Sequence, residues 1–212
     1  DPVEIRLKNG VEDGDAMPGK GPTLKGVCFK PTLHALAGYL KQEKGPREKN
    51  KGWGVACGAW GLNPVTGNVG PASSAWVKIN EDGTVVLITG VTDSGGGQYG
   101  LLAQIVAEIL SIPPDSIVVI AADTDCTPYE LGTGGSRTTY RVGTSVRIAA
   151  EDARQKLLGL AAETLNVSPS ELNLHHGRVF VKSNPEKSLG LAALASASLT
   201  SRNGSVIGVG ER

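Results

Sequence analysis

Apolar residues recur at helical spacing in several segments of the chain. In residues 31–44, Leu33, Leu36 and Leu40 follow one another at intervals of three and four, which places them on one face of a helix. A stronger apolar stripe begins at Leu101, and a pair of prolines follows its predicted end. Further helices are predicted over residues 2–9, over 136–165 with a break near Gly159, and over 189–198.

Other apolar runs are short or alternate with polar residues, as β-strands do. The run Ile117–Ala122 is continuous, which is typical of a strand covered on both faces. Strands are also predicted over residues 53–60, 75–80 and 84–89, with a capped turn at 168–171 and a hairpin over 172–182. These patterns predict an α+β (mixed α/β) fold, in which helices pack on small mixed sheets and strand–glycine loop–helix units recur.

Two glycine-rich loops each stand between a predicted strand and a predicted helix. The first glycine loop, Thr92–Gly100, has the sequence Thr-Asp-Ser-Gly-Gly-Gly-Gln-Tyr-Gly. The second glycine loop, Leu131–Thr139, has the sequence Leu-Gly-Thr-Gly-Gly-Ser-Arg-Thr-Thr. Consecutive glycines let backbone N–H groups converge, and the following helix N-terminus favours an anion. Two such loops in tandem indicate one large polyanionic cofactor, held at several points in a common cleft.

Composition narrows the classes of function. The chain has 212 residues, and its 21 basic and 21 acidic residues cancel, so no nucleic-acid partner is expected. No apolar run approaches the ~20 residues of a membrane span. The three cysteines are too widely spaced for a zinc or iron–sulfur site, and their odd number argues against a disulfide framework. We therefore expect a reducing, cytoplasmic protein.

The glycine loops leave two alternatives open. Gly95, Gly97 and Gly100 match the dinucleotide fingerprint of a Rossmann-type dehydrogenase, and Asp123 follows 23 residues later. Against it, four residues separate the strand from the first glycine, and the last third of the chain lacks further βα units. The second loop could also be a purely structural cap, with Ser136 as the N-cap and its arginine paired with Asp123 or Asp125. A P-loop is excluded because no lysine follows the glycines.

The remaining titratable residues do not form a convincing catalytic or metal site. Acidic and imidazole side chains fall on helix positions, on solvated faces or beside a turn, without partners at ligand spacing. The residues weighed are Asp93, Glu108, Glu163, His34, His175 and His176. Cys126 lies near the second glycine loop, and we expect it to be a buried structural thiol rather than a reactive one.

Four segments, in order, resemble one known family. Asp1–Asn9 is similar to a DP-x-E-x-R-x-x-N motif, Trp53–Ala56 to a strand of small residues, and Gln104–Pro113 to a QI-x-AE-x-L-G-I helix. Asp123–Thr139 is similar to a DT-x-x-x-P-x-x-x-GT-x-x-SR-x-T loop. The chain thus resembles the molybdenum-cofactor-binding large subunit of the xanthine dehydrogenase and aldehyde oxidase family, in particular the bacterial branch with carbon monoxide dehydrogenase.

The resemblance implies a molybdopterin dinucleotide with molybdenum, of the cytosine form usual in bacterial relatives. It identifies the two glycine loops as the cofactor grip; the candidate cofactor-binding residues are Gly95, Gly96, Gly97, Gln98, Thr133, Gly134, Gly135, Ser136, Arg137 and Thr138. The chain departs from the family in one place, because Gly96 stands where a glutamine usually contacts the ligands of the metal. The resemblance therefore does not carry that contact over, although Gln98 lies two residues further on.

The same resemblance implies an oxidoreductase that hydroxylates an aldehyde, an N-heterocycle or a similar small substrate with oxygen from water. Its partners would be the remaining parts of the large subunit, together with subunits or domains that carry 2Fe-2S clusters and FAD. We expect residues 1–212 to belong to the molybdopterin-binding domain of such a longer subunit, with 1–50 a mostly helical entry segment and 51–212 an α+β core. No catalytic residue is identified, and the isolated chain is expected to be inactive. A non-catalytic cofactor-binding or assembly module of the same fold is the alternative.

Overall fold

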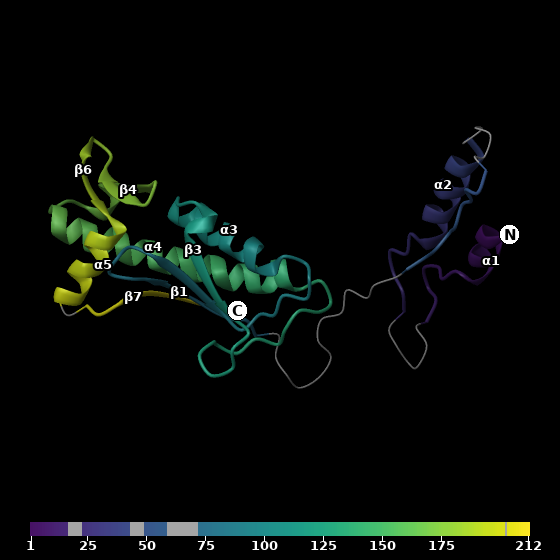
Figure 1. Ribbon diagram of the computed structural model, residues 1–212, viewed down its shortest axis with the longest axis horizontal. Helices are drawn as coiled ribbons and strands as arrows, with labels where there is room; N and C mark the ends of the chain where they lie inside the picture. The colour runs from purple at the N-terminus through teal and green to yellow at the C-terminus, as the bar shows by residue number, and fades with distance from the viewer. Residues whose placement is uncertain (17–22, 43–48, 59–71, 202) are drawn as a thin grey trace. The chain divides into compact units, whose positions relative to one another are not determined.

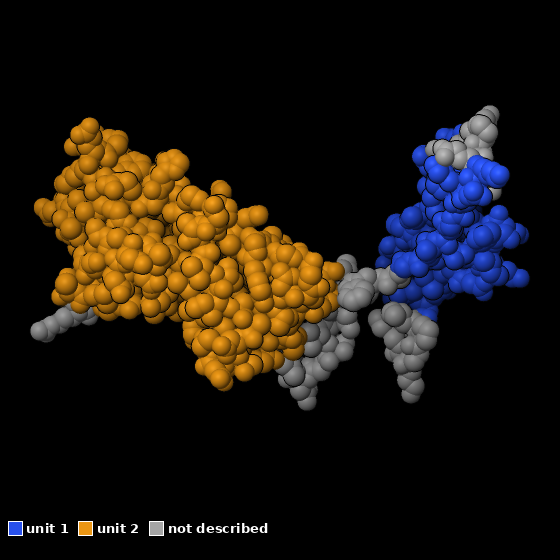
Figure 2. Space-filling model, in the orientation of Figure 1, with its two compact units in different colours: residues 1–59 blue, residues 60–212 orange. Residues whose placement is uncertain are grey.

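The computed structural model describes residues 1–16, 23–42, 49–58, 72–201 and 203–212. The chain forms two compact units, Asp1–Ala59 and Trp60–Arg212 (Figure 2).

The first unit contains the two predicted N-terminal helices. Helix α1 (Pro2–Asn9) begins after Asp1, whose carboxylate accepts a 2.6 Å hydrogen bond from the backbone N–H of Val3. Helix α2 (Phe29–Gln42) buries Leu33, as its apolar spacing predicts, and the last two residues of the predicted helix lie outside the described part. The strand predicted from residue 53 is wrong over residues 53–58, which form no strand and are mostly exposed. Residues 59 and 60 of that prediction lie outside the described residues.

The second unit contains the predicted α+β arrangement (Figure 1). Its strands are β1 (Ser74–Ile79), β2 (Val85–Thr89), β3 (Ile117–Ala121), β4 (Leu172–His175), β5 (Arg178–Val181), β6 (Asn184–Gly190) and β7 (Val206–Glu211). Its α-helices are α3 (Gln98–Leu110), α4 (Gly143–Leu165) and α5 (Leu191–Thr200). Three short helical turns complete it: η1 (Pro114–Ser116), η2 (Thr138–Val142) and η3 (Pro169–Glu171), of which η2 is a π-helix.

Two separate sheets organise the second unit. The larger has the strand order β3-β2-β1-β7, in which β1 is antiparallel to both neighbours and β2 is parallel to β3. The smaller is the antiparallel sheet β4-β5-β6. Within the described residues β2–β3 is the one parallel pair, so the sheet is not the doubly wound parallel sheet that a Rossmann-type dehydrogenase requires.

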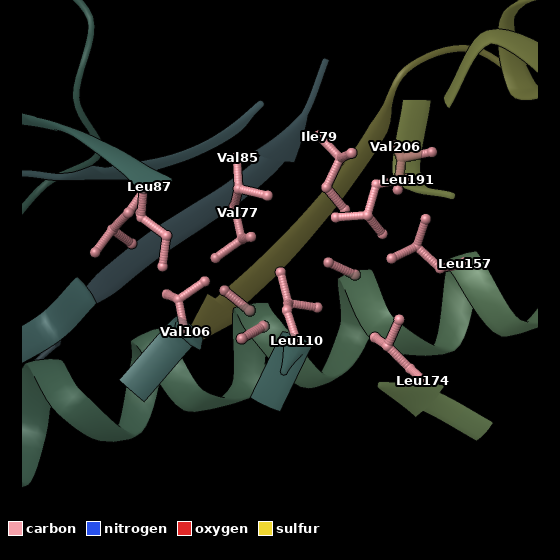
Figure 3. Packing of buried hydrophobic residues seen from close by; sticks show 14 of the residues in the cluster. Val77, Ile79, Val85, Leu87, Val106, Leu110, Leu157, Leu174, Leu191 and Val206 are labelled. Atoms are coloured by element: carbon pink, nitrogen blue, oxygen red, sulfur yellow. The ribbon is translucent and has the colours of Figure 1, made fainter. Parts of the chain in front are cut away.

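The core lies between one face of the larger sheet and the helices. Side chains of alternate strand residues, among them Val77 and Leu87, point at Val106 and Leu110 of α3 and at Leu157 of α4 (Figure 3). All five are fully buried or nearly so, which is why the period-two strands and the period-3.6 helices fit together here.

Glycines let strand β7 approach helix α4. A Cβ atom on Gly208 would collide with the backbone oxygen of Ala149, and one on Gly210 with that of Ser145. The helix backbone therefore lies directly against the strand, at a separation that only glycine permits.

Two predicted elements differ from the structure for identifiable reasons. Strand β3 is an edge strand with one exposed face, because Val118 and Ile120 are 53% and 40% exposed; its continuous apolar run does not mean cover on both faces. Helix α4 continues without a break through Gly159, since packing against the sheet outweighs the weak helix propensity of glycine. Strand β7 was not predicted, because its two glycines interrupt the apolar pattern.

Candidate functional site

The two glycine loops leave the same edge of the larger sheet. Strands β2 and β3 are parallel, so their carboxyl ends lie together, and each is followed by one of the loops. The side chain of Thr133 in the second loop donates a 2.9 Å hydrogen bond to the backbone oxygen of Thr92 in the first. Each loop leads into a helix, α3 at Gln98 and η2 at Thr138. The prediction that both loops begin helices is confirmed and the loops are adjacent, whereas a cleft common to both stays a prediction.

Side chains of the first glycine loop already occupy its backbone donors. Oδ1 of Asp93 accepts hydrogen bonds from the N–H groups of Gly95 at 2.8 Å and Gly97 at 3.2 Å. Oε1 of Gln98 accepts the N–H of Gly96 at 3.2 Å. The Asp93 carboxylate thus occupies the position that an external anion would need, although the three glycines themselves are exposed.

Gly96, which replaces the glutamine usual in the family, lies beneath the side chain of Gln98. The Gln98 side chain is 8% exposed and folds back over Gly96, where a Cβ atom would lie 2.9 Å from its Nε2. The carboxamide also donates a 3.4 Å hydrogen bond to Ser94. A side chain at residue 96 would therefore displace the Gln98 carboxamide from this position.

The second glycine loop keeps its donors open. In the described part of the chain, the N–H groups of Gly134, Gly135 and Ser136 donate to no protein acceptor. Gly135 and Ser136 both have positive φ angles, 55° and 58°, a conformation that turns successive N–H groups towards one side. A Cβ atom added to Gly134 would meet no protein atom within 4 Å. With the exposed hydroxyl of Ser136, this loop presents uncommitted donors to a ligand.

A buried ion pair anchors this open loop. Arg137 is 8% exposed, and its guanidinium pairs with the Glu130 carboxylate, whose side chain is fully buried. The guanidinium also donates to the Gly132 oxygen at 3.0 Å and to Oγ of Ser73 at 2.8 Å. These contacts to Glu130, Gly132 and Ser73 fix the loop backbone. The ion-pair partner is Glu130 rather than Asp123 or Asp125, and Ser136 does not cap the following helix, since it precedes the residue at the N-cap of η2.

The network continues into the sheet through Ser73. This residue forms an isolated β-bridge with Glu130 and exchanges backbone hydrogen bonds with Arg212 next to β7. Its backbone oxygen accepts a 2.9 Å hydrogen bond from the Ser145 hydroxyl of α4. Sequence reasoning did not identify Ser73, because its contacts join residues far apart in the chain. It also missed Glu130, for which the position two residues before Gly132 is the available signal.

The other candidates lie partly within the second glycine loop and partly away from both loops. Thr138 is buried and donates to the Thr133 hydroxyl at 3.2 Å. Ser111 lies 2.9 Å from Nδ1 of His175 beside a surface hollow at the opposite end of α3, which the glycine loops do not line. Among the described residues, no group of three or more histidine, cysteine or acidic side chains could hold a metal, and no described helix is long and apolar enough to cross a membrane.

The expectation that Cys126 is buried is wrong. Cys126 is exposed in the structure. Partial desolvation, together with the carboxylates of Asp123 and Asp125, raises the pKa of its thiol. A raised pKa leaves less thiolate at neutral pH, so the environment opposes a nucleophilic role.

Comparison with known proteins identifies the family. The model of the molybdopterin cofactor-binding domain matches residues 32–210. The putative xanthine dehydrogenase molybdenum-binding subunit of Escherichia coli K12 is 33% identical over 199 residues, which is 89% of this chain and 26% of that protein. The carbon monoxide dehydrogenase large chain of Afipia carboxidovorans is 38% identical over 128 residues, 60% of this chain and 16% of that protein.

A solved structure gives the same answer. The reconstituted CO dehydrogenase from Oligotropha carboxidovorans superposes with a TM-score of 0.61 at 35% sequence identity, covering 66% of this chain and 18% of that one. The chain therefore spans about a quarter or less of the length of these relatives. It belongs to the molybdopterin cofactor-binding domain family of xanthine dehydrogenase-type and carbon monoxide dehydrogenase-type large subunits.

Proposed function

We propose that the second glycine loop binds the phosphate oxygens of a molybdopterin dinucleotide. The observation that carries this proposal is the set of open N–H groups at Gly134, Gly135 and Ser136 beside the exposed Ser136 hydroxyl. A polyphosphate needs several converging hydrogen-bond donors that no protein acceptor already occupies. The loop supplies such donors in a backbone that the buried Arg137 contacts hold in place. The chemistry of this donor set fits the cofactor of the family.

The residues of the two loops take different roles in this proposal. Ser136 adds a hydroxyl donor beside the open N–H groups. Thr133 instead donates its hydroxyl hydrogen to the first loop, and Arg137 and Thr138 act through the loop that they position. In the first loop the exposed backbone of Gly95, Gly96 and Gly97 lets the cofactor approach closely without donating to its phosphates. Gln98 keeps that backbone in shape through its hydrogen bond to residue 96.

The complete enzyme would hydroxylate an aldehyde, an N-heterocycle or a similar small substrate, with oxygen from water. The names of relatives support this class: one is a xanthine dehydrogenase subunit and another is the nicotine 6-hydroxylase large subunit of Paenarthrobacter nicotinovorans. The bound cofactor would supply the redox chemistry, and this chain would orient it and shield it from water. We propose that it has the cytosine form, that 2Fe-2S and FAD reside on partner subunits or domains, and that the assembly is cytoplasmic. The chain alone should not oxidise aldehydes or purines in a dye-linked assay.

The loop assignment is tested by comparing Gly134→Val with Gly159→Val in protein purified together with its natural partners. Both glycines have open space around the Cβ position, so neither change creates a clash within the chain. Valine at 134 would obstruct the ligand and shield the adjacent N–H groups, and cofactor affinity should fall about tenfold or more if one or two charge-assisted hydrogen bonds are lost. Molybdenum and released nucleotide are measured by mass spectrometry. Equal cofactor content in both variants would contradict the assignment.

A further inference from the structure

The larger sheet has a second face that no helix of the described chain covers. We call it the outer face; it consists of Ser74, Trp76, Lys78, Val86, Ile88, Val118, Ile120, Ile207, Val209 and Glu211. Strand register aligns most of these residues in two rows, Val209–Trp76–Ile88–Ile120 and Ile207–Lys78–Val86–Val118. Apolar side chains occupy every position of these two rows but that of Lys78, and the polar pair of Ser74 and Glu211 lies beyond the first row.

The outer face is open at both edges of the sheet. Val118 and Ile120 on β3 are 53% and 40% exposed, and Ile207 and Val209 on β7 are 36% and 43% exposed. Antiparallel sheets with one solvated face normally alternate apolar and polar residues. A contiguous apolar patch on such a face marks an interaction surface.

The size of the outer face limits what can cover it. Four strands at a spacing of about 4.8 Å and about five residues each, at 3.3 Å, give an area on the order of 300 Å². A stable interface between separate proteins needs about 800 Å² from each partner. This face alone therefore cannot hold a second copy of the chain or a freely diffusing subunit. It is sufficient for a segment tethered in the same polypeptide, whose effective concentration is in the millimolar range.

We propose that the outer face is the docking surface for another part of the same large subunit. This inference rests on the proposed function, in which the chain is part of a longer subunit. The relative from Escherichia coli and the solved CO dehydrogenase chain are about four to six times as long as the segment that this chain matches. The docking segment presents an apolar surface, with a carboxylate or carbonyl oxygen opposite the Lys78 ammonium, since a buried cation needs an acceptor.

Thiol labelling tests the proposal. Val118→Cys and Val209→Cys place one thiol at each edge of the outer face, and Glu186→Cys on β6 of the other sheet is the matched exposed control. Maleimide labelling, resolved by peptide mass spectrometry from the native cysteines, is compared in two proteins. One is the 212-residue chain; the other is the Escherichia coli xanthine dehydrogenase subunit in which this chain replaces the matched segment.

All three thiols should label at similar rates in the chain alone. In the longer subunit, the thiols at 118 and 209 should label at about one tenth of that rate or more slowly still. The labelling rate of the control should be unchanged. Unchanged rates in a folded chimera would overturn the proposal, and so would protection that appears only when iron–sulfur and FAD subunits are added. The labelling is done without cofactor, so a failure of cofactor binding leaves its result intact.

Sedimentation velocity of the 212-residue chain decides the matter if the chimera does not fold. The area argument predicts a monomer at micromolar concentration. A dimer that Ile120→Lys dissociates would show that a second copy covers the face, and would overturn the assignment to the same subunit.

Discussion

Removing the guanidinium of Arg137 tests how the second glycine loop is held. In the folded chain this group pairs with Glu130 and donates to Gly132 and Ser73, so it connects both ends of the loop to the sheet. The substitution Arg137→Ala breaks all three contacts at once. It also leaves a carboxylate that has no exposure to water, and whose second oxygen already lacks a partner among the described residues.

The expected cost follows from that burial. Breaking a buried pair by removing one partner typically destabilises a protein by about 3–5 kcal/mol, because the remaining charge stays uncompensated. For a chain of this size the melting temperature should fall on the order of 10 °C. The double variant Glu130→Gln/Arg137→Met removes both charges and keeps an acceptor for the Gly132 N–H, so it should lie within about 2 kcal/mol of the parent.

Urea unfolding followed by circular dichroism measures these differences. Arg147→Ala is the matched control, since this arginine pairs with Glu151 on the surface of α4, where both side chains are about half exposed; its loss should cost less than about 0.5 kcal/mol. If Arg137→Ala costs no more than the control, the ion pair does not hold the loop. A variant that keeps its stability but loses molybdenum would instead show that Arg137 contacts the cofactor directly.

Three further measurements probe other parts of the chain. Gly210→Ala should destabilise the second unit by about 1–3 kcal/mol because the new Cβ would collide with the backbone of Ser145, whereas Gly159→Ala should stabilise it slightly; equal unfolding midpoints would contradict this. Desolvation alone would raise the pKa of Asp152, but hydrogen bonds from the next-turn lysine and a β7 N–H outweigh it and lower the pKa below the ordinary 3.8. The ionised Asp152 carboxylate therefore stabilises the fold by about 0.5–1 kcal/mol above its ordinary pKa, and this contribution is lost as the pH falls through the pKa of the folded state. The variant Asp152→Asn should match the parent in stability in acid and be less stable than the parent at pH 7. Because the pKa of Cys126 is raised, its alkylation at neutral pH should be slower than that of an unstructured cysteine peptide, and an equal rate would refute the shift.

Local signals in the sequence predicted most of the fold. The proline at the first position of α1, the capping box at Ser168 and the turn between β1 and β2 each involve residues within four positions of one another. Whether each face of a strand is buried depends instead on segments that are distant in the sequence. The apolar run of β3 is compatible with either burial or exposure of its second face, and only the position of β3 at the sheet edge decides between them.

The site was predictable to the level of the loops and not of their contacts. Both glycine loops were found because glycine repeats and the following helices are local patterns, and their adjacency follows from the parallel pair β2–β3. The partner of Arg137 was not, because Asp123, Asp125 and Glu130 are all near in sequence and backbone geometry selects among them. The part played by Ser73 depends on a bridge across more than fifty residues, which no local pattern records.

The two loops are alike in sequence but differ in the availability of their donors, and one arginine accounts for the difference. In each loop an acidic residue two positions before the first glycine accepts the N–H of that glycine, Asp93 for Gly95 and Glu130 for Gly132. In the first loop the same carboxylate oxygen reaches forward to a second glycine N–H and closes the loop on itself. In the second loop Arg137 pairs with the carboxylate instead and holds it in the interior. The later N–H groups therefore remain without a protein acceptor, which is the condition under which a glycine loop can bind a phosphate from outside the chain.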